Sequence, residues 1–326
     1  VVSWLAPVVE LAGLAADVVP LSNRRAVWRS ARRLREVVGE ARIDAVTLTP
    51  SFSSALLLRL AGVRSLRGIA GGGRSLLLTE RIDRGPLLEG HRVNEYLAIC
   101  GFRSTEPPEP PRIDGPGPAR ADEAWRTAPA GAAARLAAER SVAERSTAGG
   151  RVGAVVGLFP GANGPARRWP PDRFGRLAGR LGRSGATVLV FGGPGDEETT
   201  AAVSGAAGDR AFDLGGRTSL AELAGALRSC DLLVTNDTGP MHLAAALGRP
   251  VLALEGPADL RQTRPLGART RVVGRFDLPC VPCVKNACPR RGEGYVLPDA
   301  RRECMRLIEV DEVENAVREM LNEEPR

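Results

Sequence analysis

The sequence predicts an α/β protein of two domains, with a doubly wound parallel sheet in its second half. In that half, apolar runs that read as strands alternate with amphipathic helical segments, which is typical of a parallel sheet with crossover helices. A stretch rich in Pro and Gly, residues 107–118, breaks any regular element and separates the two halves. At 326 residues and 43% hydrophobic content, the chain is long enough to bury two cores.

The elements expected in the first half are short, and the first of them begins in the middle of a βαβ pattern. We expect the end of a strand at Val1–Val2, a helix over Leu5–Leu14, a strand near Val18–Leu21, a strand over Asp44–Thr49 and a helix over Ser54–Ala61. Because the first residue is Val and the pattern begins inside a βαβ unit, we expect a further strand, turn and helix to precede it in the native chain.

The second half carries a clearer pattern. Strands are expected over Val152–Phe159, Thr187–Phe191, Asp231–Thr235, Val251–Leu254 and Arg271–Val273. Apolar residues recur at helical spacing over 174–181 and 220–227, between these strands. Ser219 with Glu222 three residues later predicts a capping box at the start of the second of these helices. Residues 119–150 read as a helix plus connector.

The segment 236–250 is the most informative of the chain. An apolar strand ends there in a polar turn, and a helix opens with Thr238 as N-cap and Pro240 in its first turn. The free N–H groups and the dipole of a helix start favour phosphate. Asp237 would bind sugar hydroxyls or order the turn. His242, one turn after the cap, either faces the same ligand or is a structural histidine.

Two more turns follow predicted parallel strands. The turn at 159–170 is rich in Gly and carries Arg167 and Arg168, which suit phosphate oxygens. The turn at 192–197 ends in Asp196 and Glu197, which either accept bonds from sugar hydroxyls or act as first-turn acids of a helix. Because open α/β sheets bind ligands at the carboxyl ends of their strands, these turns predict a diphosphate held from two sides.

The composition limits the classes of binding partner that we expect for this protein. The net charge of +7 suits an acidic substrate or an anionic membrane face, whereas 4% aromatic content and the lack of a nucleic-acid motif argue against nucleic acid. The arginine cluster at 24–35 is either a solvated helix face or a lipid contact. The opening apolar stretch is interrupted by Glu10 and Asp17, so we expect a cytoplasmic protein without a signal peptide or membrane span.

Four late cysteines, Cys280, Cys283, Cys288 and Cys304, have C-x2-C-x4-C spacing and one distant partner. Four thiolates could hold a structural zinc ion. The last spacing is irregular for a zinc ribbon, however, and we expect no metal here.

Taken together, these motifs resemble family 9 glycosyltransferases, the heptosyltransferases of the lipopolysaccharide inner core. The resemblance rests on P-G-A at 160–162 followed by R-R-W-P at 167–170, on L-G-G-R-T-S-L at 214–220, on N-D-T-G-P-M-H-L-A at 236–244, and on C-x2-C followed by Cys304-Met305. It is dense over 152–308 and looser over 1–102, where 44–62 and 91–93 still look similar.

The resemblance implies a GT-B fold, two Rossmann-like domains with parallel sheets facing a cleft. It places an acceptor domain at 1–118, a connector at 119–150, a donor domain at 151–310 and a last helix, 311–326, that crosses back to the first domain. It implies inverting transfer of a sugar from a nucleotide-diphosphate sugar such as ADP-heptose, without a required metal cofactor. The acceptor would be a phosphorylated glycolipid at the inner membrane.

The resemblance also implies residue roles. Donor-binding roles fall on Gly161, Ala162, Arg167, Asp196, Glu197, Asn236, Asp237, Thr238, Gly239, Met241 and His242, and acceptor-side roles on Ser53, Ser54 and His91. Arg167 stands where the family usually has a lysine. The family's aspartate after its first strand, the expected general base, has no counterpart before Trp4, so the catalytic residue is unassigned. Alternatives are an inactive or fragmentary nucleotide-sugar or lipid-binding protein, and a GT-B enzyme using a UDP-sugar.

Overall fold

The computed structural model describes residues 9–10, 12, 19, 27–39, 43–87, 89–102, 112–113, 117–132, 134, 153–288 and 303–323. The chain divides into two compact units: one holds Leu14–Glu109 with Leu260–Arg264, and the other holds Pro110–Asp259 and Pro265–Arg326. The elements expected over Val1–Val2, Leu5–Leu14 and Val18–Leu21 lie almost entirely outside the described residues.

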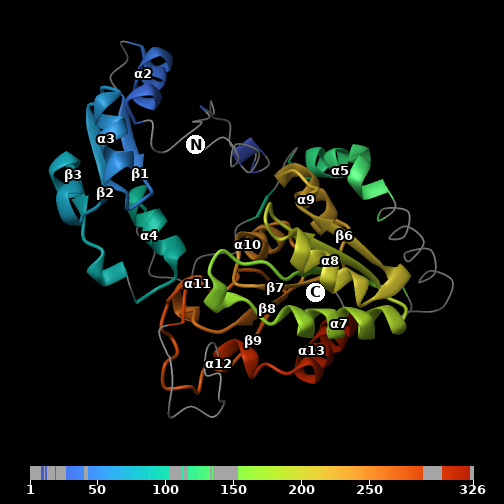
Figure 1. The fold of residues 1–326 in the computed structure, drawn as a ribbon. Coiled ribbons are helices and arrows are strands. Elements are labelled where there is room, and N and C mark those ends of the chain that lie inside the picture. Colours follow the sequence, from blue (N-terminus) through green and yellow to red (C-terminus); the bar gives the residue numbers. More distant parts are fainter. Residues whose placement is uncertain are drawn as a thin grey trace. The chain divides into compact units, whose positions relative to one another are not determined.

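The first unit is built on a small parallel sheet of three strands (Figure 1). In chain order its elements are α2 (Val27–Val38), β1 (Asp44–Thr47), α3 (Phe52–Leu60), β2 (Ser65–Ile69), β3 (Glu80–Ile82) and α4 (Arg92–Ile99). Ala55, Val63, Leu66 and Leu78 form its core. The strand and helix expected over 44–49 and 54–61 are confirmed, whereas β2 and β3 escape sequence reasoning because each is short and interrupted by charge or Gly.

The second unit contains a parallel sheet of six strands. They are β4 (Val155–Phe159), β5 (Thr187–Gly192), β6 (Ala211–Gly215), β7 (Leu232–Asn236), β8 (Val251–Glu255) and β9 (Thr270–Gly274). Their spatial order is β6-β5-β4-β7-β8-β9, which is the Rossmann order. Strands β5 and β6 are added on one side of β4, and β7, β8 and β9 are added on the other side, so the direction in which strands are added reverses between β4 and β7. All five predicted strands are confirmed. The sixth, β6, was not predicted.

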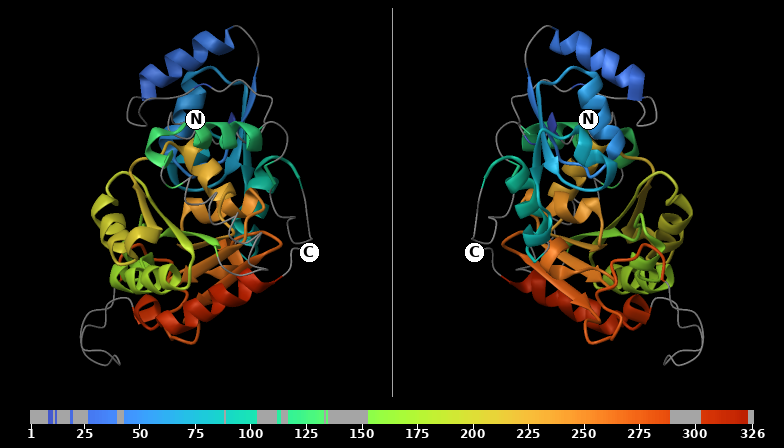
Figure 2. Two further views of the ribbon diagram at one scale, coloured as in Figure 1. Left: turned by 90° about the vertical axis from the view of Figure 1, so that its right-hand side faces the viewer. Right: turned by 90° about the vertical axis from the view of Figure 1, so that its left-hand side faces the viewer.

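Helices cover both faces of this sheet (Figures 1 and 2). They are α5 (Gly117–Thr127), α7 (Pro171–Arg183), α8 (Glu197–Gly205), α9 (Leu220–Arg228), α10 (Gly239–Ala246), α12 (Glu303–Arg306) and α13 (Val310–Asn322), while α11 (Leu260–Thr263) groups with the first unit. One core lies between the sheet and α7, α12 and α13, and the other between the sheet and α5, α9 and α10. The capping box of Ser219 and Glu222 is present.

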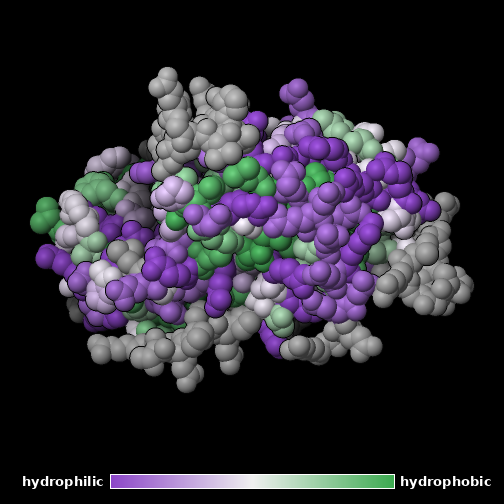
Figure 3. Space-filling view, turned by 90° about the horizontal axis from the view of Figure 1, so that it is seen from below, coloured by the Kyte–Doolittle hydropathy of each residue, from purple (hydrophilic) through white to green (hydrophobic). Residues whose placement is uncertain are grey.

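The last helix packs within the second unit. Val310, Val313, Val317 and Met320 of α13 are buried in the same core as α7. Salt bridges join the two helices outside that core, since Arg180 pairs with Asp311 and with Glu314 (2.8 Å to the latter). In the space-filling view from below, hydrophilic side chains cover much of the surface, with apolar patches between them (Figure 3).

Close packing of α5 against α9 depends on Gly225. A Cβ atom at this position would lie 2.1 Å from the backbone oxygen of Ala121 and 2.5 Å from the Cβ of Trp125. We therefore predict that Gly225→Ala lowers the free energy of unfolding by about 1–3 kcal/mol, because backbone cannot yield as a flexible side chain does. Urea denaturation would measure this.

The matched control is Gly205→Ala at the end of α8, where an added Cβ meets nothing within 4 Å. Its helical setting predicts no loss, and a gain of up to about 1 kcal/mol. Equal destabilisation by both variants would contradict the packing of α5 on α9 described here.

Candidate functional site

The predicted donor residues gather near the carboxyl ends of β4 and β7, where the strand order of the sheet reverses. Pro160 directly follows β4, and Asp237 directly follows β7, and these two strands are neighbours. In open α/β sheets the crevice at the carboxyl ends of such a strand pair is the preferred ligand site. The turns at 159–170 and 236–242 therefore lie at one corner of the second unit, which we call the switch corner.

Asn236 joins the two turns of the switch corner. Its side chain is fully buried at the end of β7. Its Oδ1 accepts a hydrogen bond from the backbone N–H of Trp169 (3.0 Å). Its Nδ2 donates to the carbonyl oxygens of Pro160 (2.8 Å) and Gly161 (3.3 Å). Both ends of the amide are thus bound to backbone, so Asn236 shapes the site.

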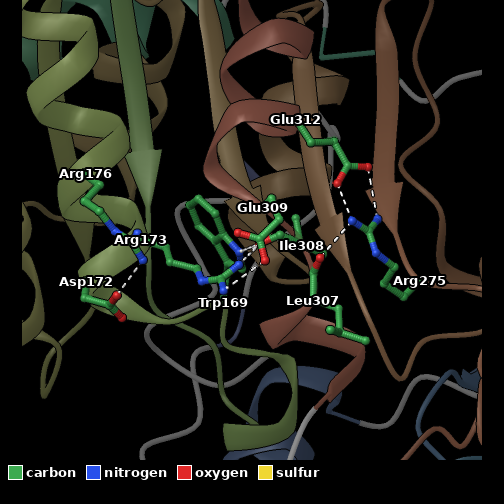
Figure 4. A network of polar contacts seen from close by, with 9 residues as sticks. All are labelled: Trp169, Asp172, Arg173, Arg176, Arg275, Leu307, Ile308, Glu309 and Glu312. Carbon is green, nitrogen blue, oxygen red and sulfur yellow. Dashed lines mark hydrogen bonds and ion pairs between the residues drawn. The ribbon is translucent and has the colours of Figure 1, made fainter. Parts of the chain in front are cut away.

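Trp169 anchors the other side of the turn. Its indole N–H donates to the carbonyl oxygen of Ile308 (2.9 Å), and its ring meets Phe174 edge-on at 4.9 Å. Arg173 donates to the same carbonyl oxygen and pairs with Glu309 (3.2 Å). Figure 4 shows this network, which ties the turn after β4 to the segment between α12 and α13.

The same network continues toward β9. The guanidinium of Arg275, just after β9, pairs with Glu312 and donates to the carbonyl oxygen of Leu307 (2.8 Å) (Figure 4). This contact lowers the pKa of Glu312, through the hydrogen bond from Arg275 first. The segment between α12 and α13, which accepts the hydrogen bond of Trp169, is therefore held by residues that follow two different strands, β4 and β9.

Arg167 and Asp237, both predicted to bind the donor, form an ion pair. Their Nη1 and Oδ2 atoms lie 2.9 Å apart, and the side chains are 27% and 7% exposed. A pair this shielded from water holds its geometry better than a surface pair. Asp237 thus keeps the guanidinium of Arg167 in place at the mouth of the corner.

Asp196 and Arg168 line the β4 side of the corner. Arg168 donates to the carbonyl oxygen of Ala162 (2.8 Å) and lies 3.5 Å from Asp196. Asp196 accepts the backbone N–H of Gly193 (3.2 Å) and fills the space beside Gly161, where a Cβ would stand 2.3 Å from its carboxylate. A side chain at position 161 would displace the carboxylate of Asp196 from this place.

Glu197 begins α8 and closes the turn before it. It accepts the backbone N–H of Gly195 (2.8 Å). Backbone hydrogen bonds of Glu197 itself and of Gly195 lower its pKa. The structure thus shows the helix-start role that the sequence left open for this residue, and its carboxylate also lies against Gly216.

The start of α10 is shaped as predicted, with one difference. Thr238 occupies the N-cap position in extended conformation, but its side chain makes no capping hydrogen bond and lies 3.3 Å from the hydroxyl of Thr235. Gly239 borders open space. Met241 is fully buried and His242 is exposed, so only the histidine of these two faces solvent.

Glu255, the last residue of β8, is a member of this corner that sequence reasoning missed. It is fully buried, and neither carboxylate oxygen has a hydrogen-bond partner among the described residues. Burial, and then the charge of Asp237, raise its pKa to about 9, while Arg167 acts in the opposite direction. The sequence signal that could have revealed Glu255 is an acidic residue at the very end of an apolar strand, L-A-L-E at 252–255.

The three acceptor-side candidates lie in the first unit. Ser53 and Ser54 stand in the first turn of α3, and the Ser53 hydroxyl is 2.6 Å from that of Ser51. His91 is the N-cap of α4, where its Nδ1 accepts the N–H of Val93 (3.2 Å). Its Nε2 lies 3.0 Å from the carbonyl oxygen of Arg264, and burial lowers its pKa.

The cysteines of the described residues are free thiols. Cys304 is buried at the start of α12, and burial, followed by the nearby thiols of Cys280, Cys283 and Cys288, raises its pKa to about 12. No three metal-ligating side chains of the described part of the chain are arranged to hold a metal ion.

One other surface feature lies apart from the corner. A cavity of about 550 Å³ between α7 and α8 is lined by Arg176, Arg180 and Arg183, among others, and by none of the predicted donor residues. Within the described part of the chain, every helix is too short or too polar to span a bilayer.

Comparison with known proteins gives a consistent assignment. Residues 28–292 match the family described as "Glycosyltransferase family 9 (heptosyltransferase)". Lipooligosaccharide heptosyltransferase 2 of Haemophilus influenzae is 37% identical over 124 residues, which is 36% of each chain. The corresponding protein of Haemophilus ducreyi is 29% identical over 246 residues, 72% of this chain and 66% of its own. The matches thus span between about a third and two thirds of these relatives.

Solved structures share the fold. The ADP-heptose lipopolysaccharide heptosyltransferase II of E. coli aligns over 98% of this chain and 87% of its own, with a TM-score of 0.68 and 24% identity. A family 9 glycosyl transferase of Veillonella parvula covers 98% and 92%, with a TM-score of 0.67 and 21% identity. Both are similar in architecture to this α/β chain. Because the family match extends over most of its length, the chain belongs to glycosyltransferase family 9, the heptosyltransferases.

Proposed function

We propose that this protein is an inverting glycosyltransferase that moves a heptose from ADP-heptose to a lipopolysaccharide core acceptor. The observation that carries the proposal is the switch corner, where Asn236 joins two turns that present Arg167, Asp237 and the start of α10 together. Membership of family 9, and relatives named as heptosyltransferases, support the choice of sugar.

In this proposal the corner binds the diphosphate of the donor. Backbone N–H groups at Thr238 and Gly239 and the positive end of α10 would face the phosphate oxygens, which the open space at Gly239 allows. The guanidinium of Arg167, held in place by Asp237, would donate charge-assisted hydrogen bonds to the phosphate oxygens. The same groups would stabilise the negative charge that develops on the leaving diphosphate, and this arrangement requires no metal.

Asp196, Glu197 and His242 would surround the nucleoside or sugar hydroxyls. Asp196 lies beside Gly161 at the same strand ends, and His242 is exposed on the first turn of α10. In a single displacement the acceptor hydroxyl loses its proton as it attacks the anomeric carbon, which calls for a carboxylate base. The family's aspartate for this step has no assigned counterpart among the described residues.

We place the reaction at the cytoplasmic face of the inner membrane, where a glycolipid acceptor would lie. Helix α2 supports this placement, because it exposes Trp28 together with Arg29, Arg32 and Arg33. An exposed indole beside guanidinium groups suits an anionic headgroup layer. Ser53, Ser54 and His91 of the first unit would lie on the acceptor side.

The direct test is transfer. We expect incubation with labelled ADP-heptose and a heptose-deficient core lipid to give a labelled product, and UDP-sugars to give none. Donor binding without transfer would identify instead a nucleotide-sugar-binding protein on this scaffold. Transfer from a UDP-sugar in preference to ADP-heptose would contradict the donor assignment.

Arg167 offers a sharper test of the donor site. We predict that Arg167→Ala weakens ADP-heptose binding by about 1.5–3 kcal/mol, roughly 10- to 150-fold, because a charge-assisted contact is lost. Calorimetric titration measures the change.

The matched control is Arg176→Ala on α7, an exposed arginine that pairs with Asp172 (2.9 Å) outside the corner. It should leave donor affinity within about twofold, as expected for a surface substitution. Unchanged affinity in the Arg167 variant, with the protein folded, would remove the diphosphate from this corner.

A further inference from the structure

Residues 278–288, which we call the strap, follow β9 and are held to the second unit by packing and by hydrogen bonds. Leu278 and Val281 pack against the core that α7 and α13 share. The backbone N–H of Val284 donates to the carbonyl oxygen of Pro257 (2.8 Å), just beyond the end of β8. Val284 has a φ of 53°, which is strained for a β-branched residue and persists where neighbouring contacts hold it. The strap therefore has a defined path at this point.

The strap also contacts the turn that carries Arg167. The carbonyl oxygen of Asn286 accepts the backbone N–H of Ala166 (2.9 Å), the residue before Arg167. A Cβ atom at Gly164 would lie 3.0 Å from the Cα atom and 3.1 Å from the carbonyl oxygen of Asn286. Backbone thus meets backbone at close range, and the strap and the turn after β4 form one surface.

Lys285 lies between these two contacts. In the sheet, β7 stands between β4 and β8, and the end of β7 leads directly into Asp237 and Thr238. Val284 is bonded beyond β8, whereas Asn286 is bonded to the turn after β4. The residue between them is therefore placed at the part of the sheet edge where β7 ends. The topology brings Lys285 to the switch corner.

The chemistry of Lys285 differs from that of the arginines in the corner. It is the only lysine among the 45 Lys and Arg residues of the sequence. Arg167 pairs with Asp237 (2.9 Å), and Arg168 lies 3.5 Å from Asp196. Lys285 is exposed, and its ammonium group forms no ion pair or hydrogen bond within the described part of the chain. A compact ammonium group on a flexible stem binds phosphate as a point charge.

We propose that Lys285 is a further donor-binding residue, whose ammonium group contacts the diphosphate of the nucleotide sugar from the strap. This inference rests on the proposed donor-binding role of the switch corner. The diphosphate of a nucleotide sugar carries two negative charges, and the start of α10 meets it with backbone N–H groups. Lys285 adds a mobile cation that does not have to leave a carboxylate of the described residues before it binds.

The first test compares ADP affinity in the wild type and in Lys285→Met, which keeps an apolar stem but removes the charge. We expect the variant to bind ADP about 5- to 20-fold more weakly in calorimetric titrations, because a charge-assisted contact is lost. The difference should shrink at about 0.5 M NaCl, since salt screens an exposed charge.

The matched control is Arg183→Met on α7, which removes an exposed cation from outside the corner and gives the same change in net charge. Its ADP affinity should stay within about twofold of the wild type. An equal loss in both variants would show an effect of net charge and would overturn the contact from Lys285.

Chemical labelling gives a readout that needs no substitution. Because the sequence holds a single lysine, acetylation of lysine by an amine-selective reagent reports on Lys285 alone. Saturating ADP should slow this acetylation at least about fivefold, since an ammonium group bound to phosphate keeps its proton and is not nucleophilic. Mass spectrometry measures the rate, and a lysine-containing peptide in the same reaction should show no slowing.

Gly164→Ala tests the path of the strap. Its backbone conformation, with φ of −99°, accepts alanine, but the new methyl group meets the backbone of Asn286 and displaces the strap from the turn. In this background Lys285→Met should reduce ADP affinity less than about twofold, because two changes that act through one contact are not additive. A full additional loss would contradict delivery of Lys285 by the strap.

The outcomes separate the two proposals. Wild type that binds no ADP would overturn the donor site and the role of Lys285 together. Binding of ADP with the same affinity by wild type and Lys285→Met would overturn the role of Lys285 and leave the donor site in place. Acetylation of Lys285 at the same rate with and without bound ADP would do the same.

Discussion

One buried amide holds the candidate site together. Asn236 accepts a hydrogen bond from the backbone of Trp169 and donates to the carbonyl oxygens of Pro160 and Gly161, so a single side chain fixes the spacing of two turns from different strands. Its burial makes the arrangement specific, because loss of the amide would leave three backbone groups unsatisfied at about 1–3 kcal/mol each. The positions of Arg167, Asp237 and α10 all follow from this joint.

The sheet explains why that joint lies where it does. Strands β4 and β7 are neighbours in space but far apart in sequence, and the chain leaves them toward opposite faces of the sheet. A crevice must therefore open at their carboxyl ends. The polar residues that follow these apolar strands meet there without any further requirement on the fold.

Local patterns predicted much of this, and long-range pairing accounts for what they missed. The capping box at Ser219, helix α7 and the five strands were recognisable because each has a strong local period or cap. Strand β6 was not, since it is a half-exposed edge strand with Asp213 at its centre. Glu255 looked like the polar end of a strand, and only the register with β7 reveals that it is buried against a second acid.

The link between Trp169 and Ile308 has a consequence for how the protein is made. The indole N–H of Trp169 donates to the carbonyl oxygen of Ile308, which lies 139 positions later in the chain and is therefore synthesised later. A nascent chain that has completed β4, β7 and their turns still lacks this contact. The turn after β4 should consequently reach its final position late in translation, after α13 has emerged from the ribosome and docked.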